Sequence, residues 1–333
     1  MKAAYKKGQV VTIKAFQLRA LKPDEIRIKV DACGVCGTDL QVNPDDANNE
    51  ALFGHEMAGR ILETGSAVSG LKVGQKVVIE SATPCGKCDN CRNTRQELCS
   101  DIQSFFFLGY FGFAEETIVP AICAIPCEDL SPEVASISEP LGVAIDLVRL
   151  ADITINSNVL VMGQGPIGLM AAALVKRAGA RRVFVSEFGD KTARKNMAES
   201  LGVDGFIDPR KTPVAKYDFG CAIDRVLITA PPPCLNDAFA VACKGGIISF
   251  IGIAHGENAY CKFNVNDFHF KKLQLRASFA SPALYTPMAL QYLREGVING
   301  EALISHRFKL DETAKAIETS RNDAGALKVI VKP

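Results

Sequence analysis

Short runs of alternating apolar and polar residues fill the first 140 residues of the chain. Examples are Glu25–Val30 (EIRIKV) and Lys76–Glu80 (KVVIE), and Gly, Pro and Asp residues separate such runs. A period of two predicts β-strands with one buried face, and the separating residues predict turns. We therefore expect this part of the chain to be mostly β.

The pattern changes near Asn158, where apolar strands begin to alternate with helical patterns. The predicted strands are NVLVM, RVFVS, FGCAI and IISFIG, at residues 158–162, 182–186, 219–223 and 247–252. This alternation predicts βαβ units and a parallel sheet. After Leu273 short strands return (LQLRASF), followed by a helix near Pro287–Glu295 and a β-rich end (LKVIVKP). We expect an α/β protein in which both ends of the chain form a β-rich domain and the middle forms an inserted one.

Composition limits the functional classes that the chain can belong to. Its 333 residues suffice for two domains, and with 48% hydrophobic and 23% charged residues it has the profile of a globular protein. A formal net charge of +1 gives no electrostatic case for binding nucleic acid or an anionic membrane. The start, MKAAYKKGQV, lacks the apolar run of a signal peptide, and no stretch approaches the length of a membrane span. We therefore expect a cytoplasmic protein, whose twelve cysteines bind metal or stay buried as thiols.

Four cysteines gather in one short polar segment. Cys85, Cys88, Cys91 and Cys99 follow the pattern C-x2-C-x2-C-x7-C, and charged and turn-forming residues lie between them. Four thiolates at this spacing fit a closed, tetrahedral, structural Zn²⁺ site, and such a lobe folds around its metal. Two disulfides or four free thiols are the alternatives, and disulfides require an oxidising compartment.

A glycine-rich loop follows the predicted strand 158–162 directly and leads into a helical pattern. The residues of this GxGxxG loop are Gly163, Gln164, Gly165, Pro166, Ile167 and Gly168. Between a strand and a helix, the first glycine makes the turn, the second lets a pyrophosphate approach, and the third lets the helix pack closely. The free N–H groups of the helix N-terminus then stabilise the phosphates.

The second predicted strand of this region ends in a carboxylate. Glu187 lies 19 residues after Gly168, where it can accept hydrogen bonds from the ribose 2′-hydroxyl and repel a 2′-phosphate. NAD is therefore favoured over NADP. Arg194 and the nearby lysines are counter-evidence, and we interpret them as a solvated helix face.

A second, open metal site is predicted from residues outside the cysteine-rich lobe. Cys36 precedes Gly37-Thr38-Asp39, and His55-Glu56 follows Gly54. Thiolate, imidazole and carboxylate are all Zn²⁺ ligands, and three protein ligands leave a coordination position for water or substrate. Glu139, before the inserted domain, could supply a further carboxylate. A buried core histidine is the alternative interpretation of His55.

These motifs together resemble the zinc-dependent medium-chain dehydrogenases, in the branch of sorbitol, threonine and other polyol or sugar dehydrogenases. The resemblance runs nearly end to end and includes CGTD, GHE, the cysteine-rich lobe, GFAEE, SEPL, GxGxxG and KGG. It implies a GroES-like catalytic domain at 1–144 and 276–333, with the zinc lobe at 84–100, and a Rossmann domain at 145–275. It also implies a homodimer or homotetramer.

The resemblance further implies roles for single residues. Cys36, His55 and Glu56 match the catalytic zinc ligands, and Glu139 matches a carboxylate that binds zinc directly or through its water. Thr38 matches the hydroxyl that passes on the substrate proton, and Asp39 matches the partner of the zinc-binding histidine. The implied reaction transfers a hydride from an alcohol to NAD, with a catalytic and a structural Zn²⁺ in each chain.

Several features depart from the polyol branch. Only 18 residues separate Cys36 from His55, which predicts an altered or more open pocket, and Gln41 stands where relatives often carry a proton-relaying histidine. Residues 226–233 (VLITAPPP) replace a glycine-bearing loop beside the nicotinamide. Phe105–Phe107 either wall the substrate pocket or pack in the core, and we favour the core.

The leading hypothesis is a dehydrogenase that oxidises a secondary alcohol of a polyol, cyclitol or sugar acid with NAD. An L-threonine-type enzyme and a simple alcohol dehydrogenase are the alternatives within enzymes. A catalytically inactive dinucleotide-binding sensor is the alternative outside them, and the intact Cys36, His55, Glu56 and Thr38 argue against it. A zinc-ribbon protein that binds nucleic acid is disfavoured because the charge is neutral.

Overall fold

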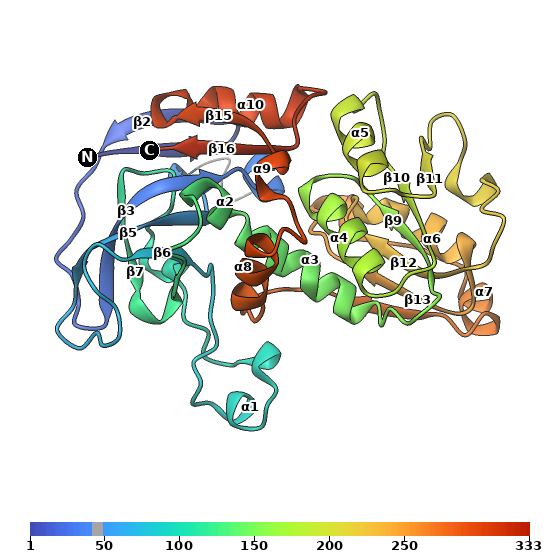
Figure 1. Cartoon of the computed structure of the whole chain (residues 1–333), viewed down its shortest axis with the longest axis horizontal. Coiled ribbons are helices and arrows are strands. Elements are labelled where there is room, and N and C mark those ends of the chain that lie inside the picture. The colour runs from blue at the N-terminus through green and yellow to red at the C-terminus, as the bar shows by residue number, and fades with distance from the viewer. Residues whose placement is uncertain (42–48) are drawn as a thin grey trace. The chain divides into compact units, whose positions relative to one another are not determined.

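The computed structural model describes residues 1–41 and 49–333, which form two compact units. Residues 1–142 and 280–333 form the first unit, and residues 143–279 form the second (Figure 1). The predicted segment between Cys36 and His55 lies partly outside the described residues, because 42–48 are not among them.

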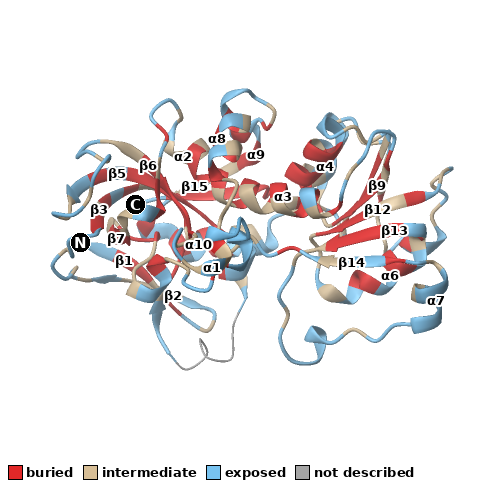
Figure 2. Ribbon diagram, turned by 90° about the horizontal axis from the view of Figure 1, so that it is seen from below, coloured by how far each residue is buried: buried red, intermediate tan, exposed pale blue. Residues whose placement is uncertain are grey.

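The first unit is built on a mostly antiparallel sheet. Its strands run in the order β15-β16-β3-β5-β6-β8, with β7 also pairing with β3, and a smaller sheet has the order β2-β1-β4. The strands of these two sheets are β1 (Lys2–Lys7), β2 (Val10–Ala15), β3 (Glu25–Gly34), β4 (Ala51–Leu52), β5 (Glu56–Thr64), β6 (Lys76–Ile79), β7 (Glu116–Pro120), β8 (Ala124–Pro126), β15 (Ile304–Lys309) and β16 (Lys328–Lys332). The alternating pattern of β3 places Ile26, Ile28 and Val30 in a buried core (Figure 2).

Short helices complete the first unit and carry several of the predicted site residues. They are α1 (Asp89–Arg92), α2 (Pro132–Ser136), α8 (Thr286–Arg294), α9 (Gly300–Leu303) and α10 (Thr313–Asn322), with the 3-10 turns η1 (Gly37–Leu40), η2 (Gln96–Leu98), η3 (Phe105–Leu108), η4 (Ala121–Cys123) and η8 (Leu310–Glu312). Helix α3 (Ser138–Leu150) begins in the first unit and continues into the second.

The second unit holds a parallel sheet with strand order β11-β10-β9-β12-β13-β14. Its strands are β9 (Asn158–Met162), β10 (Arg182–Ser186), β11 (Gly205–Ile207), β12 (Ile223–Ile228), β13 (Ala242–Phe250) and β14 (Gln274–Ala277). The helical segments are α4 (Pro166–Arg177), α5 (Thr192–Ser200), α6 (Leu235–Val241) and α7 (Val265–Phe270), with η5 (Val214–Lys216), η6 (Pro232–Cys234) and η7 (Gly256–Ala259). The order reverses at β9, which is typical of doubly wound nucleotide-binding sheets.

One predicted strand lies in the wrong place. The sequence pattern put a strand at 219–223, whereas β12 spans Ile223–Ile228 and so includes the first three residues of the segment interpreted as a loop at 226–233. Asp224 and Arg225 interrupt the apolar pattern of this strand, so the sequence pattern did not predict it. Their charges are satisfied at its start, where Asp224 accepts a hydrogen bond from Asn158 N at 3.0 Å and Arg225 Nε donates to Asp152 O at 3.0 Å.

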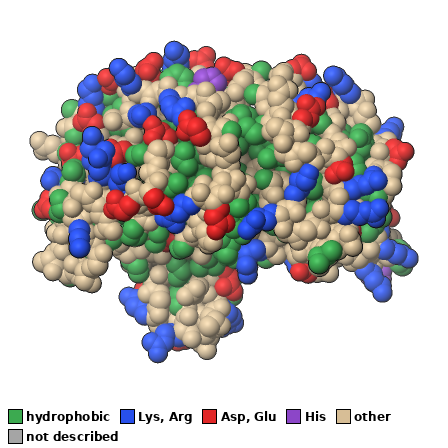
Figure 3. Space-filling model, in the orientation of Figure 1, with side chains coloured by type: hydrophobic (Ala, Val, Ile, Leu, Met, Phe, Trp, Pro, Cys, Tyr) green, Lys and Arg blue, Asp and Glu red, His purple; other side chains and the backbone are tan. Residues whose placement is uncertain are grey.

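Among the described residues, no helix combines the length and the apolar character needed to cross a membrane. On the face seen in Figure 3, acidic and basic side chains are interspersed.

Candidate metal centres and dinucleotide site

The pairing of β3 with β5 brings the predicted open site together. Gly34 at the end of β3 pairs with Glu56 at the start of β5, so Cys36 lies beside His55. Ligand atoms of Cys36, His55 and Glu56 all lie within 4.8 Å of one another. Glu56 is buried, whereas Cys36 and His55 are half-buried, so this group can accept a ligand from outside. One sulfur, one imidazole nitrogen and one carboxylate fit a zinc ion with an open position.

The turn η1 follows Cys36 directly and carries Thr38 and Asp39. Thr38 is exposed, whereas Asp39 is buried and accepts a hydrogen bond from Cys36 N at 2.9 Å through Oδ2. Burial raises the pKa of Asp39. Asp39 therefore holds the main chain at Cys36, in addition to its electrostatic interaction with His55.

Two cations from distant parts of the chain hold the end of η1. Lys6 Nζ donates to Asp39 O at 2.7 Å and also to Gln41 O, and Arg321 Nη2 donates to Leu40 O at 2.9 Å. Carbonyl groups at the end of a helical turn lack partners within it, and cations there satisfy them. The sequence alone did not indicate this support.

Glu139 lies in the first turn of α3, near the open site but outside its three-residue group. Its Oε1 lies 3.3 Å from the Ser81 hydroxyl, which donates to it. Burial raises the pKa of Glu139. Burial by itself would lower the pKa of His55, but the Cys36 thiolate and the carboxylates of Glu139 and Asp39 outweigh it and hold that pKa well above its usual value. The site thus concentrates negative charge around one imidazole, which favours a bound cation.

Two further side chains adjoin the open site. The Phe106 ring lies 5.9 Å from the His55 ring and is 41% exposed, while Phe105 is fully buried. The core interpretation therefore holds for Phe105 but not for Phe106, which stands beside the candidate ligand. Lys328 of β16 is almost fully buried and forms an ion pair with Glu56. The sequence analysis missed Lys328, although a lysine inside an apolar strand run needs a partner to be buried.

The cysteine-rich lobe gathers its four predicted ligands. The sulfur atoms of Cys85, Cys88, Cys91 and Cys99 all lie within 4.8 Å of one another. Main-chain amides direct hydrogen bonds at these sulfurs, such as Cys85 N to Cys99 Sγ at 3.4 Å. Hydrogen bonds from the amides of Cys91 and Ser100 lower the pKa of Cys88 to about 5. A thiolate already stabilised by amides fits a tetrahedral zinc site with no open position.

The glycine-rich loop of the second unit is shaped for a phosphate group. Gly163 has a φ of +94°, and a Cβ at Gly168 would overlap the Gly163 carbonyl oxygen, so both positions need glycine. Helix α4 starts at Pro166, after Gly165, with no side chain capping its first N–H groups. Apart from its two chain neighbours, no atom of the described residues would lie within 4 Å of a Cβ at Gly165, so space remains in front of the helix. Ile167 lies in the first turn of α4.

The interpretation of Arg194 as a solvated side chain was wrong. Its Nη1 donates to Glu187 Oε2 at 3.1 Å, and both side chains are less than one-fifth exposed. Glu187 also accepts a hydrogen bond from Gln164 N at 2.7 Å, which ties it to the glycine-rich loop. Arg194 lies in the first turn of α5, the helix that follows β10, and its side chain reaches Glu187 at the end of that strand.

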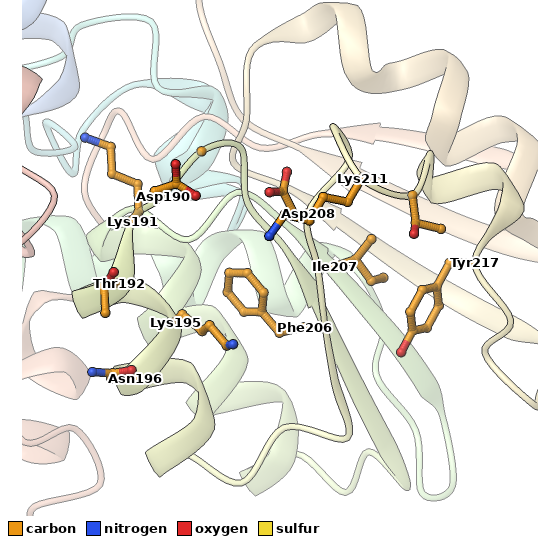
Figure 4. Close-up of a pocket in the computed structure, with 12 residues that line it drawn as sticks. Asp190, Lys191, Thr192, Lys195, Asn196, Phe206, Ile207, Asp208, Lys211 and Tyr217 are labelled. Carbon is orange, nitrogen blue, oxygen red and sulfur yellow. The ribbon is translucent and has the colours of Figure 1, made fainter.

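A pocket of about 440 Å³ lies next to this pair, at the carboxyl ends of β10 and β11. Figure 4 shows Lys191, Thr192 and Lys195 on one side of it, facing Asp208 and Lys211 across Phe206. Ligands of open α/β sheets bind at the carboxyl ends of the strands.

Comparisons with known proteins agree with this architecture. Residues 22–129 match the alcohol dehydrogenase GroES-like domain, and residues 166–294 match the zinc-binding dehydrogenase domain. The chain is similar to L-threonine 3-dehydrogenase of Rhizobium etli (strain CIAT 652), with 30% identity over 317 residues, covering 90% of this chain and 89% of that protein. The corresponding enzyme of Pyrococcus horikoshii is 33% identical over 316 residues, covering 90% and 88%.

Solved structures give the same answer. A zinc-binding dehydrogenase of Sinorhizobium meliloti 1021 bound to NADP superposes with a TM-score of 0.85 at 28% identity, covering 100% of this chain and 99% of that chain. An alcohol dehydrogenase of Escherichia coli CFT073 in complex with NADH gives a TM-score of 0.89 at 26% identity, with the same coverage. A GroES-like domain followed by a parallel-sheet zinc-binding dehydrogenase domain defines an oxidoreductase. The chain belongs to the zinc-dependent medium-chain dehydrogenases, which confirms the predicted fold class and family.

Proposed function

We propose that this protein is a zinc-dependent dehydrogenase that oxidises a secondary alcohol of a polyol, cyclitol or sugar acid with NAD. The observation that carries the proposal is the group of Cys36, His55 and Glu56, whose ligand atoms lie within 4.8 Å of one another. A zinc ion there would act as a Lewis acid toward the substrate oxygen. The four cysteines of the lobe would hold a second, structural zinc.

The residues around the open site have distinct parts in this proposal. Thr38 is exposed on η1 and would take the hydroxyl proton from the substrate. Asp39 would fix Cys36 through its hydrogen bond to the Cys36 amide. A carboxylate ligand in place of a second thiolate makes the site more polar, which suits a substrate with two adjacent oxygens. Phe106 would form an apolar wall beside His55.

L-threonine is the second candidate substrate, and the relatives named above favour it. Its C3 hydroxyl is also a secondary alcohol with a polar neighbour, here an amino group. A threonine enzyme must in addition bind the carboxylate and the ammonium group of its substrate. We assign none of the described residues near His55 to this binding. A screen of polyols, cyclitols, sugar acids and L-threonine with NAD⁺, followed by NADH absorbance, decides between them. No turnover with any secondary alcohol would contradict the proposal.

Glu187 supports NAD as the cofactor, because its carboxylate lies at the end of β10, tied to the glycine-rich loop. We expect Glu187→Ala to raise the Kd for NAD about tenfold to a hundredfold, since a hydrogen bond to a charged group contributes roughly 1.5–3 kcal/mol. Affinity for NADP should fall less or rise, because Arg194 is then free to pair with a 2′-phosphate. Isothermal titration calorimetry with each nucleotide measures both constants. Equal losses for both nucleotides would show that Glu187 does not read the ribose.

We also propose that the chain forms a homodimer or homotetramer in a reducing compartment. Strand β14 is an edge strand, and Leu275, Phe279 and Phe270 on or near it are 38%, 73% and 68% exposed. Exposed apolar side chains near an unpaired strand edge are typical of an interface. Light scattering coupled to size exclusion tests this proposal, and a monomer at micromolar concentration would contradict it.

A further inference from the structure

Lys328 is a buried cation placed directly against the candidate open metal site. Its side chain is 2% exposed, and its ammonium group forms an ion pair with Glu56, whose side chain is 1% exposed. The same ammonium donates to Val35 O at 2.9 Å, next to Cys36. The Lys328 side chain therefore links the main chain beside Cys36 to the carboxylate of Glu56.

The sheet is built so that this pair can form. Lys328 lies on β16 and Glu56 on β5, and β3 lies between these two strands. The two side chains meet over Gly34, the last residue of β3, which pairs with Glu56. A Cβ on Gly34 would overlap Glu56 Oε2 and would lie 2.8 Å from Lys328 Cε. Glycine at this position thus leaves the space that the ion pair occupies.

A carboxylate that is held by an ammonium group is a weaker metal ligand than a free one. The ammonium occupies Glu56 Oε2 and removes one negative charge from a ligand set of thiolate, imidazole and carboxylate. Without Lys328, the Glu56 carboxylate would be buried with no counter-charge, which is costly, so it would bind a metal ion more tightly.

We propose that Lys328 is a positioning residue that shares the Glu56 carboxylate with the metal ion and keeps this ligand exchangeable. An exchangeable Glu56 can give up its coordination position when a substrate oxygen arrives. The inference rests on the proposed function, because it takes Cys36, His55 and Glu56 as the metal ligands.

The test measures metal binding as well as turnover. Zinc release from the holoenzyme to a chromogenic chelator reports both sites, and the phase that is missing in Cys36→Ser belongs to the open site. We expect Lys328→Met to slow this phase at least tenfold and to lower kcat at least tenfold. With Co²⁺ in the open site, the visible d–d bands should change in position and intensity, because the Glu56 oxygen becomes a permanent ligand.

Two further variants separate positioning from a merely structural role. Lys332→Met removes a lysine of the same strand that pairs with Glu133 at 2.6 Å, and it should leave release, spectrum and kcat unchanged. In a Glu56→Gln background, Lys328→Met should change the release rate less than twofold. The inference is overturned if Lys328→Met lowers only the melting temperature, or if its effect persists without the Glu56 carboxylate. If Cys36→Ser instead contains as much zinc as the wild-type enzyme, the proposed function is overturned.

Discussion

The two candidate metal sites of this protein are built in opposite ways. The lobe takes its four sulfurs from residues 85–99, within one short excursion of turns (Figure 1). The open site takes its groups from the ends of strands β3 and β5, with Glu139 and Lys328 nearby. The lobe has candidate ligands of one kind and few apolar residues, so we expect its fold to depend on a metal ion. The open site lies on a sheet with an apolar core of its own, so we expect a metal ion there to serve catalysis and not folding.

Cys36→Ser should have the largest effect on turnover and almost none on folding. Loss of a Lewis acid costs several kcal/mol of transition-state stabilisation, so kcat should fall about a thousandfold or more. Affinity for NAD should stay within twofold, because the glycine-rich loop belongs to the other unit. Steady-state kinetics and nucleotide titration measure these two quantities. Retained turnover would contradict the assignment of the open site.

Cys91→Ser should show the opposite pattern, with a large effect on the folding of the lobe and a smaller effect on turnover. The lobe would lose its metal and open, so trypsin should cleave at Lys87, Arg92 and Arg95 at least tenfold faster than in the wild type. Turnover should fall less than in Cys36→Ser, which serves as the matched control with an intact lobe. A lobe that resists trypsin equally well in both variants would argue against a structural metal.

The smallest expected effect is a pH dependence confined to the lobe. Hydrogen bonds from the amides of Cys91 and Ser100 lower the pKa of Cys88 from 9.0 to about 5. The folded state therefore favours the thiolate, and this stabilisation is complete above pH 9 and shrinks as the pH falls toward 5. We expect the lobe to lose its zinc progressively as the pH falls, because protons compete with the metal for the thiolates. Zinc release to a chelator between pH 7 and 4, with Cys91→Ser lacking this phase, provides the measurement.

The same contrast explains what sequence could predict. Local spacing was sufficient for the lobe and for the GxGxxG loop, because their chemistry lies within a few consecutive residues. Strand pairing was needed to bring Cys36 and His55 together, so residue types only indicated an open site and the family resemblance assigned the individual ligands; the comparisons confirm the family. Lys328 and the inward direction of Arg194 could not be predicted, since both depend on which side chains meet after the sheets have formed. The roles of the individual site residues stay predictions.

Support for the open site comes from opposite parts of the chain, and this has a consequence for its biosynthesis. Lys6 is made more than 300 residues before Arg321 and Lys328. During synthesis, the turn carrying Thr38 and the Glu56 carboxylate must wait for these late side chains. We expect the cysteine-rich lobe to capture zinc on the nascent chain, while the open site is complete only after residue 328 has emerged.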